Sequence, residues 1–306
     1  MSYFALAALE LTLLGLLSGI AGTLIVLRRR SFFAVALSHA TFPGGVVFAI
    51  AGWNLLLGRA LFAIVLVLLM TALARVPGQG RQVASGIVLA FGFALGTLLA
   101  SLNPGLGVPV EALLVGSPLA VTMADITVTA AVLLAALAAA SVFGRRILFH
   151  TFDPVGFRAS GFRAWPVELA VTGIITSAVV VAMPAVGAIL GVAVLIGPAA
   201  AARVLAPRTE WIPPIAAGIG VTGGLVGLWI SREFAVAAGG AIGLTMAGLF
   251  IVALAVSALM RGWIRINGPR ASEVRYREKH GVGRQDGAES ACAVPAERTV
   301  EAGGGA

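Results

Sequence analysis

The residue of this chain best suited to bind a ligand is His39, which lies in the middle of a long apolar stretch. No formally charged residue occurs between Arg30 and Arg59, and the run from Leu37 to Gly44 reads Leu-Ser-His-Ala-Thr-Phe-Pro-Gly. A histidine at membrane depth costs free energy and usually marks an ion or substrate pathway. We therefore predict that His39, with Ser38 beside it, lines such a pathway. The alternative is a packed histidine that hydrogen-bonds to a neighbouring helix.

The composition predicts that this stretch lies in a membrane. Of the 306 residues, 59% are hydrophobic and only 11% are charged, and the mean hydropathy is +1.01, whereas soluble domains carry about 25% charged residues. Several apolar runs reach the roughly 20 residues that a helix needs to cross a bilayer. The single cysteine, Cys292, excludes a disulfide framework and a cysteine metal site. We expect an all-α, polytopic protein of a prokaryotic plasma membrane.

Basic residues are distributed unevenly along the chain and predict its orientation. The net charge of +8 would suggest nucleic-acid binding in a soluble protein, but 12 of the 14 basic residues before Gly262 fall on one side of the predicted membrane. Because basic loops stay in the cytoplasm, this side is assigned as cytoplasmic, and we expect no nucleic-acid partner. The 12 residues are Arg28, Arg29, Arg30, Arg75, Arg81, Arg145, Arg146, Arg158, Arg163, Arg203, Arg208 and Arg261.

The arginine clusters separate about nine apolar segments, which predicts about nine transmembrane helices with the N-terminus outside and the C-terminus in the cytoplasm. The segments are 4–27, 32–52, 56–74, 83–101, 122–143, 165–184, 187–206, 213–231 and 235–260. Eight is the alternative, because Met183-Pro184 could make 165–206 one broken segment. Residues 102–121 predict an outer loop with a short or re-entrant helix. The transmembrane domain would cover residues 1–261, and the polar segment 262–306 is expected to be a disordered cytoplasmic tail.

A polar segment at 144–164 stands out on the cytoplasmic side. Pro154 suits the first turn of a short helix, for which Asp153 would be the N-cap. Since the segment also carries several arginines, it could present a charged surface to a partner. An ordinary charged loop is the alternative.

The chain lacks the residues of an ATP-hydrolysing site. Its one lysine, Lys279, lies in the tail, so no phosphate-binding loop of the form Gly-x-x-x-x-Gly-Lys-Ser/Thr is present. His39, His150 and His280 lie in environments too different to form a hydrolase site. We therefore expect no enzyme and no permanently bound cofactor, but a transporter whose energy comes from a partner. Four acids near predicted helix ends are expected to snorkel or to cap helices: Glu10, Glu111, Asp125 and Glu168.

Four segments in order resemble the zinc-, manganese- and iron-uptake permeases of ATP-binding-cassette importers. The signature of that family reads Gly-Asp-Ala-Leu-Ser-His-Ala-x-x-Pro-Gly, and residues 34–44 read Ala-Val-Ala-Leu-Ser-His-Ala-Thr-Phe-Pro-Gly. Residues 115–125 are similar to its Phe-Gly-Ser stretch. Residues 152–161 are similar to its Phe-Asp-Pro…Ala-Arg-Ala-Leu-Gly loop. Residues 186–203 are similar to its Val-Gly-x-Leu-Leu…Gly-Pro-Ala-Ala-x-Ala-Arg run.

The resemblance implies a permease in the lipid bilayer that takes up divalent transition metal ions. It implies three protein partners: a cytoplasmic ATP-binding-cassette ATPase, an extracytoplasmic solute-binding protein and a second copy of the permease. It also implies that the ATPase docks on a loop formed by Phe152, Asp153, Pro154 and Arg158. Helix kinks or gating are expected at Pro43 and Gly44 and again at Gly197 and Pro198, because proline removes a backbone donor and clashes with the preceding turn.

The chain departs from the family pattern at two places. Val35 replaces the signature aspartate, which would lie one turn before His39 on the same helix face. A carboxylate with an imidazole suits a divalent transition metal, whereas His39 alone supplies one ligand, or two if a second copy contributes its own. The family's acidic pair before the fourth span is absent as well, since residues 80–83 read Gly-Arg-Gln-Val. Two alternatives stay open: the same permease with a non-metal cargo, and a self-contained secondary transporter.

Overall fold

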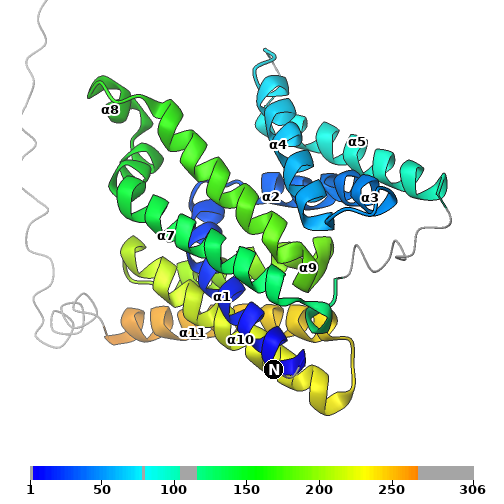
Figure 1. Ribbon diagram of the computed structural model, residues 1–306. Helices are drawn as coiled ribbons and strands as arrows, with labels where there is room; N and C mark the ends of the chain where they lie inside the picture. The colour runs from blue at the N-terminus through cyan, green and yellow to red at the C-terminus, as the bar shows by residue number, and fades with distance from the viewer. Residues whose placement is uncertain (1–2, 78–79, 104–115, 268–306) are drawn as a thin grey trace, which may run out of the picture. The chain divides into compact units, whose positions relative to one another are not determined.

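The computed structural model describes residues 3–77, 80–103 and 116–267, and within them every regular element is helical (Figure 1). Residues Met1–Ser257 form one compact unit, and a second unit begins at Ala258. The elements are α1 (Tyr3–Leu27), α2 (Ser31–Ala40), α3 (Phe42–Ile50), α4 (Leu55–Leu73), α5 (Arg81–Ser101), η1 (Pro118–Ala120), α7 (Met123–Phe152), α8 (Pro154–Ala159), α9 (Ala164–Leu205), η2 (Thr209–Trp211), α10 (Ile212–Phe234) and α11 (Ala238–Asn267).

The all-α membrane class is confirmed. Eight helical segments of the described chain are long and apolar enough to cross a membrane, with α2 and α3 together making one of them. This count takes α9 as one segment, although the predicted segments 165–184 and 187–206 are its two arms on either side of the non-helical Gly187. With the arms counted separately, the described chain contains the nine apolar segments that the sequence predicts. The predicted tail lies outside the described residues from 268 onward, while residues 262–267 continue α11. Most of the predicted outer loop, 104–115, also lies outside them.

Helix α9 reverses direction at Gly187. Its 42 residues would measure about 63 Å if straight, roughly twice the hydrocarbon thickness of a bilayer. Gly187 has φ 77° and ψ 174°, which are not helical values, and a Cβ added at Gly191 would lie 3.7 Å from the Ala182 methyl. The two arms of α9 therefore lie side by side. The break at Gly187 falls at the boundary between the predicted segments 165–184 and 187–206, and not at the Met183-Pro184 pair named for the eight-helix alternative.

The turn at Gly187 is covered by the segment that precedes α7. A Cβ added at Gly116 would lie only 2.2 Å from the amide nitrogen of Gly187, and the Ser117 amide donates to the Pro184 carbonyl at 3.3 Å. Gly116 itself has φ +67°, a left-handed conformation that favours glycine. Two glycines in contact thus hold the reversed end of α9 against this segment.

The two helices that carry the signature are short and tightly enclosed. The predicted span 32–52 is divided at Thr41 into α2 and α3. A Cβ on Gly44 of α3 would lie 2.5 Å from the Gly58 carbonyl of α4, and one on Gly96 of α5 would lie 2.2 Å from the Phe42 ring. Backbones that approach this closely require small residues, as in other membrane helix pairs. Helix α1 forms the other packing centre, because it contacts α7, α9 and α10.

Helix α7 is longer than expected. It begins at a capping box, in which Thr122 and Asp125 exchange side-chain and backbone hydrogen bonds, and this confirms the capping role of Asp125. It then continues through Arg145 and Arg146, which were assigned to a loop, and ends at Phe152. Asp153 and Pro154 follow, and a residue that precedes a proline, here Asp153, disfavours helical geometry. The predicted polar segment 144–164 is therefore mostly helix.

Candidate translocation pathway and docking helix

Helix α2 presents one partly exposed face that includes His39. Phe32 is exposed and Val35 and His39 are half-buried, while Ala36 and Leu37 on the other faces are buried. Residues four apart on a helix lie above one another, so Val35 and His39 occupy one stripe. The position of the family's aspartate therefore faces the same space as the histidine.

The His39 imidazole makes no hydrogen bond or ion pair within the described part of the chain. The two hydroxyl groups nearest to His39 in the sequence, by contrast, donate hydrogen bonds within the protein. The hydroxyl of Ser38 is buried and donates to the Val35 carbonyl at 2.9 Å. The hydroxyl of Thr41 donates to the Ser38 carbonyl at 3.1 Å and contacts the Met183 sulfur at 3.4 Å. On α2, His39 therefore shares its partly exposed face with Val35 and not with Ser38. A pathway role for Ser38 stays a prediction.

The residues expected to kink helices lie in two different settings. Pro43 occupies the first turn of α3, immediately after the division at Thr41, and Gly44 is packed against α4. Gly197 and Pro198 lie within the second arm of α9, where the backbone dihedrals stay helical. The one described residue of α9 with non-helical dihedrals is Gly187. A gating role for any of these residues stays a prediction.

Helix α8 has the capped start that the sequence predicts. The Asp153 carboxylate accepts a hydrogen bond from the Gly156 amide at 2.8 Å, and Pro154 stands in the first turn. Phe157 anchors the helix, since it is 1% exposed. Its ring contacts three other rings, those of Phe149, His150 and Phe162, at centroid distances of 5.5, 5.1 and 5.3 Å.

The outward side of α8 and the residues just before it are exposed. Phe152 is 63% exposed and Val155 73% exposed, and Asp153, Pro154 and Arg158 are also exposed. A short helix with a fixed base and an exposed apolar and charged side has the form of a docking element. The four residues predicted for ATPase docking thus lie together at one end of α7.

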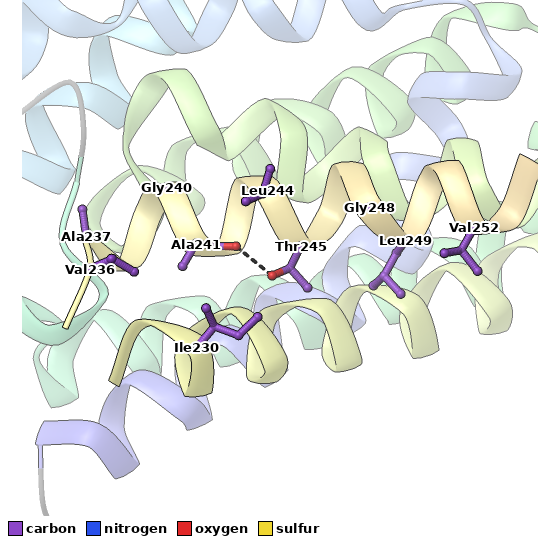
Figure 2. A pocket seen from close by; sticks show the side chains of 10 residues that line it. All are labelled: Ile230, Val236, Ala237, Gly240, Ala241, Leu244, Thr245, Gly248, Leu249 and Val252. Atoms are coloured by element: carbon purple, nitrogen blue, oxygen red, sulfur yellow. Dashed lines mark hydrogen bonds between the residues drawn. The ribbon is translucent and has the colours of Figure 1, made fainter. Parts of the chain in front are cut away.

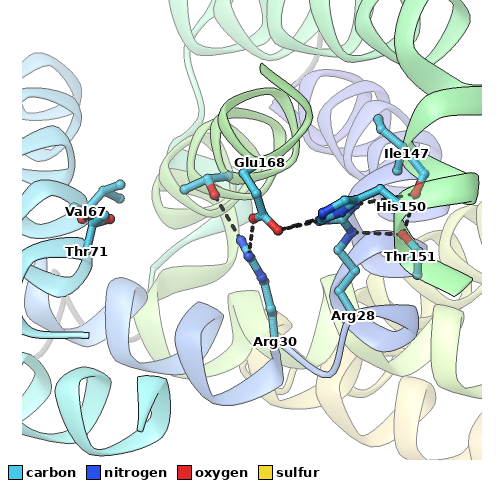
Figure 3. Close-up of polar contacts among 9 residues, drawn as sticks. Arg28, Arg30, Val67, Thr71, Ile147, His150, Thr151 and Glu168 are labelled. Atoms are coloured by element: carbon cyan, nitrogen blue, oxygen red, sulfur yellow. Dashed lines mark hydrogen bonds and ion pairs between the residues drawn. The ribbon is translucent and has the colours of Figure 1, made fainter. Parts of the chain in front are cut away.

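A polar cluster at the basic ends of several helices was missed by the sequence analysis (Figure 3). Glu168 of α9 accepts from Arg28 at 3.0 Å and also pairs with Arg30. Partial burial lowers the pKa of the Arg28 guanidinium, an effect that the Glu168 carboxylate opposes. Glu168 was expected to snorkel or cap, which is wrong. The signal that could have revealed it is a lone acid at the start of a span on a strongly basic side.

Glu10 also differs from its expected role. It is 1% exposed, and its carboxylate accepts a hydrogen bond from the Thr129 hydroxyl at 2.7 Å, which links α1 to α7. Its second carboxyl oxygen has no hydrogen-bond partner among the described residues. Glu10 is therefore an interior residue and neither snorkels nor caps, and Glu111 lies outside the described residues.

Other hollows and clusters offer no alternative site for a cation. A hollow of about 640 Å³ lies between α10 and α11, and Figure 2 shows its apolar side chains. Its one hydroxyl, that of Thr245, already donates to the Ala241 carbonyl at 2.7 Å. No group of three or more His, Cys, Asp or Glu residues that could hold a metal occurs in the described chain. His39 therefore remains the candidate ligand.

Comparison with known proteins decides the family. The model of the ABC 3 transport family matches residues 1–257, which is the whole of the first compact unit. The chain belongs to the ABC 3 transport family. A family of ATP-binding-cassette transporters favours the ATP-driven permease over a self-contained secondary transporter.

Individual members of the ABC 3 transport family resemble the chain over most of their length. The manganese transport system membrane protein MntC of Halalkalibacterium halodurans is 31% identical over 89% of this chain and 94% of its own. The zinc transport system membrane protein TroC of Treponema pallidum is 31% identical over 79% and 84%. The solved structure of PsaBC from Streptococcus pneumoniae, in complex with a Fab, has a TM-score of 0.73 and 29% identity over 83% of this chain and 91% of that chain.

Proposed function

We propose that this chain is the permease subunit of an ATP-binding-cassette importer and that its cargo is a divalent transition metal, manganese or zinc. The observation that carries the proposal is the stripe on α2, where Val35 and the His39 imidazole face the same space at the signature position. Relatives named for manganese and for zinc transport support the choice of cargo. The proposal makes the chain a permease and not an enzyme.

His39 would contact the metal as it passes. A neutral imidazole is a common ligand of divalent transition metals such as zinc, and a second copy of the chain would bring a second imidazole to the same pathway. Two nitrogen ligands hold an ion weakly compared with a closed site of four. Weak coordination suits a pathway, because the ion must leave as readily as it arrives.

Helix α8 would receive the ATPase. Its exposed side carries Val155 and Arg158 and lies next to the exposed Phe152 at the end of α7, while Phe157 fixes α8 to α7. Binding of ATP would close a pair of ATPase subunits and displace α8, and the helices attached to it would then open the pathway to the opposite side. A solute-binding protein would deliver cargo to the outer face, on which the N-terminus is expected to lie.

Transport by the purified complex tests the proposal. The permease is purified with its ATPase subunit, reconstituted in vesicles and assayed for ATP-dependent uptake of ⁵⁴Mn²⁺ or ⁶⁵Zn²⁺. We expect uptake of at least one metal and none without ATP. If the complex hydrolyses ATP but moves neither ion, the proposal of a metal cargo is wrong. This outcome would favour the second candidate, a non-metal cargo, which Val35 in place of aspartate motivates.

Cysteine labelling in intact cells tests the orientation. Cysteines placed near Arg146 and Arg208 should react only from the cytoplasm, and one near Gly58 only from outside. Reaction near Arg146 with an impermeant reagent added to cells would show that the orientation is the opposite one. Helix α8 could then not meet a cytoplasmic ATPase.

A further inference from the structure

Glu168 is the centre of a cluster that joins the ends of four helices (Figure 3). One carboxyl oxygen accepts from Arg28, just after α1, at 3.0 Å, and the other pairs with Arg30, just before α2. Arg30 also donates to the Thr172 hydroxyl of α9 at 2.9 Å. The last turns of α1, the first turn of α2 and the first turns of α9 are therefore held by one carboxylate.

The fourth helix is α7, which Arg28 reaches with its remaining donors. Arg28 donates to the Thr151 hydroxyl at 3.0 Å, to the Ile147 carbonyl at 3.4 Å and to the His150 Nδ1 atom at 3.2 Å. Since a guanidinium has no acceptor, the His150 nitrogen must accept this bond. The planar guanidinium thus uses its fixed fork of donors to connect α7 with Glu168.

The cluster differs from an ordinary surface ion pair in burial. The side chains of Arg28 and Arg30 are 6% and 14% exposed, and that of Glu168 is 27% exposed. Exposed pairs contribute little because solvent screens them, but hydrogen-bonded ionic contacts with low exposure resist separation, since each group would be left buried without its counter-charge. The four helix ends should therefore move together.

The same cluster touches the docking helix. The His150 ring lies edge-to-face against the Phe157 ring of α8 at 5.1 Å, and the short segment 160–163 joins α8 directly to α9. At its other end the cluster holds the start of α2, the 10-residue helix that carries His39. Because the span 32–52 is divided at Thr41 into two helices, α2 can move as a segment separate from α3.

We propose that Glu168 is the positioning residue through which a displacement of α8 is passed to α2 and therefore to His39. The inference deepens the proposed function and rests on it, because the displacement is the one that the ATPase would cause. In this arrangement α8 receives the movement, His150 and Arg28 connect it to Glu168, and Arg30 passes it to α2. Glu168 touches neither the cargo nor the ATPase.

Transport per ATP hydrolysed is the decisive measurement. In the reconstituted complex, Glu168→Gln should keep ATPase binding and ATP hydrolysis while metal uptake per ATP falls about tenfold, within the range by which residues that link two sites change their coupling. Arg30→Gln should produce a similar fall, and the double variant should be no worse than either, because all three interrupt the same connection. Glu210→Gln is the control, since Glu210 is an exposed acid near the cytoplasmic end of α9.

The results separate the two proposals. If the wild-type complex moves no metal, the proposed function fails and the inference fails with it. If the wild type moves metal and Glu168→Gln has the same uptake per ATP, only the inference is overturned. A loss of ATP hydrolysis and uptake in equal proportion would also overturn it, because that result indicates a structural role.

Spin labels test the movement without any cargo. Labels replace Phe32 on α2 and Val155 on α8, which are both exposed. In the wild-type complex the distance between the labels should stay unchanged when nucleotide binds, because α2 and α8 move together. In Glu168→Gln the distance between the labels should equal that of the wild type without nucleotide and should change when nucleotide binds. An unchanged distance in the variant under both conditions, or one already broadened without nucleotide, would overturn the inference.

Discussion

Two histidines in this chain occupy opposite environments. His39 lies half-buried on α2, and its imidazole makes no hydrogen bond within the described residues. His150, at the end of α7, accepts from Arg28 and packs on Phe157. A histidine in a helix therefore does not by itself mark a site. The imidazole whose nitrogen lone pair is already used serves the structure, and the one left without protein partners is the better candidate for a passing ion.

The largest expected effect comes from removing the His39 imidazole. His39→Ala should lower metal uptake and metal binding by about 100-fold or more, since even groups that only support a ligand change affinity by 10- to 100-fold. Uptake by vesicles and binding of Mn²⁺ or Zn²⁺ to the purified complex are measured together. His150→Ala is the matched control and should bind metal as the wild type does. Equal losses in the two variants would remove the distinction between the histidines.

Loss of the capped start of α8 should weaken ATPase binding without changing metal binding. Replacing Asp153 removes an N-cap, which costs about 1 kcal/mol, and replacing Arg158 removes a charge from the exposed side. We expect the double variant Asp153→Ala, Arg158→Ala to bind the ATPase about tenfold more weakly, measured by co-purification and by titration in detergent. Normal membrane insertion is the control. Full ATPase binding would show that the docking surface lies elsewhere.

Restoring the family's acid at position 35 should increase the difference between the environments of His39 and His150. In Val35→Asp, a carboxylate and the His39 imidazole share one face of α2, so metal binding should tighten by about tenfold if the cargo is a divalent metal. The variant is compared with Val35→Asn and with the double variant Val35→Asp, His39→Ala. If the cargo is not a metal, the acid is buried without a partner, and the variant should only be less stable.

The smallest expected effect is that of His150→Gln. The amide can still accept from Arg28 but loses the ring contact with Phe157, so we expect uptake per ATP to fall only a few-fold, corresponding to about 1 kcal/mol or less for one aromatic contact. Metal binding should be unchanged. A loss as large as that of His39→Ala would indicate that His150 also acts on the cargo.

Features that depend on neighbours in the sequence could be predicted. The apolar spans follow from composition, and the start of α8 follows from Asp153-Pro154, because a cap and a first-turn proline act within a few residues. The signature at 34–44 identified the family, which the match over residues 1–257 confirms. The break in α2–α3 near Pro43 also has a local cause.

Features that depend on distant residues could not be predicted. Glu168 and Arg28 are 140 positions apart, and nothing in a single sequence indicates that they pair. Glu10 likewise meets Thr129 across a helix interface. For α9 the predicted segments 165–184 and 187–206 match the two arms, but the alternative of one broken segment assigned the break to Met183-Pro184, because proline is the common helix breaker. The actual reversal uses a left-handed glycine, which sequence alone does not distinguish from the many helical glycines.

The reversal at Gly187 fixes the parity of the chain's membrane crossings. Because the second arm of α9 returns toward the end where the first began, Arg203 and Arg208 lie on the same face as Arg163. A straight α9 would make the number of crossings before α10 even instead of odd, and α10 and α11 would then cross the bilayer in the opposite direction. One residue with φ 77° thus determines whether the last third of the protein carries its basic ends into the cytoplasm or out of it.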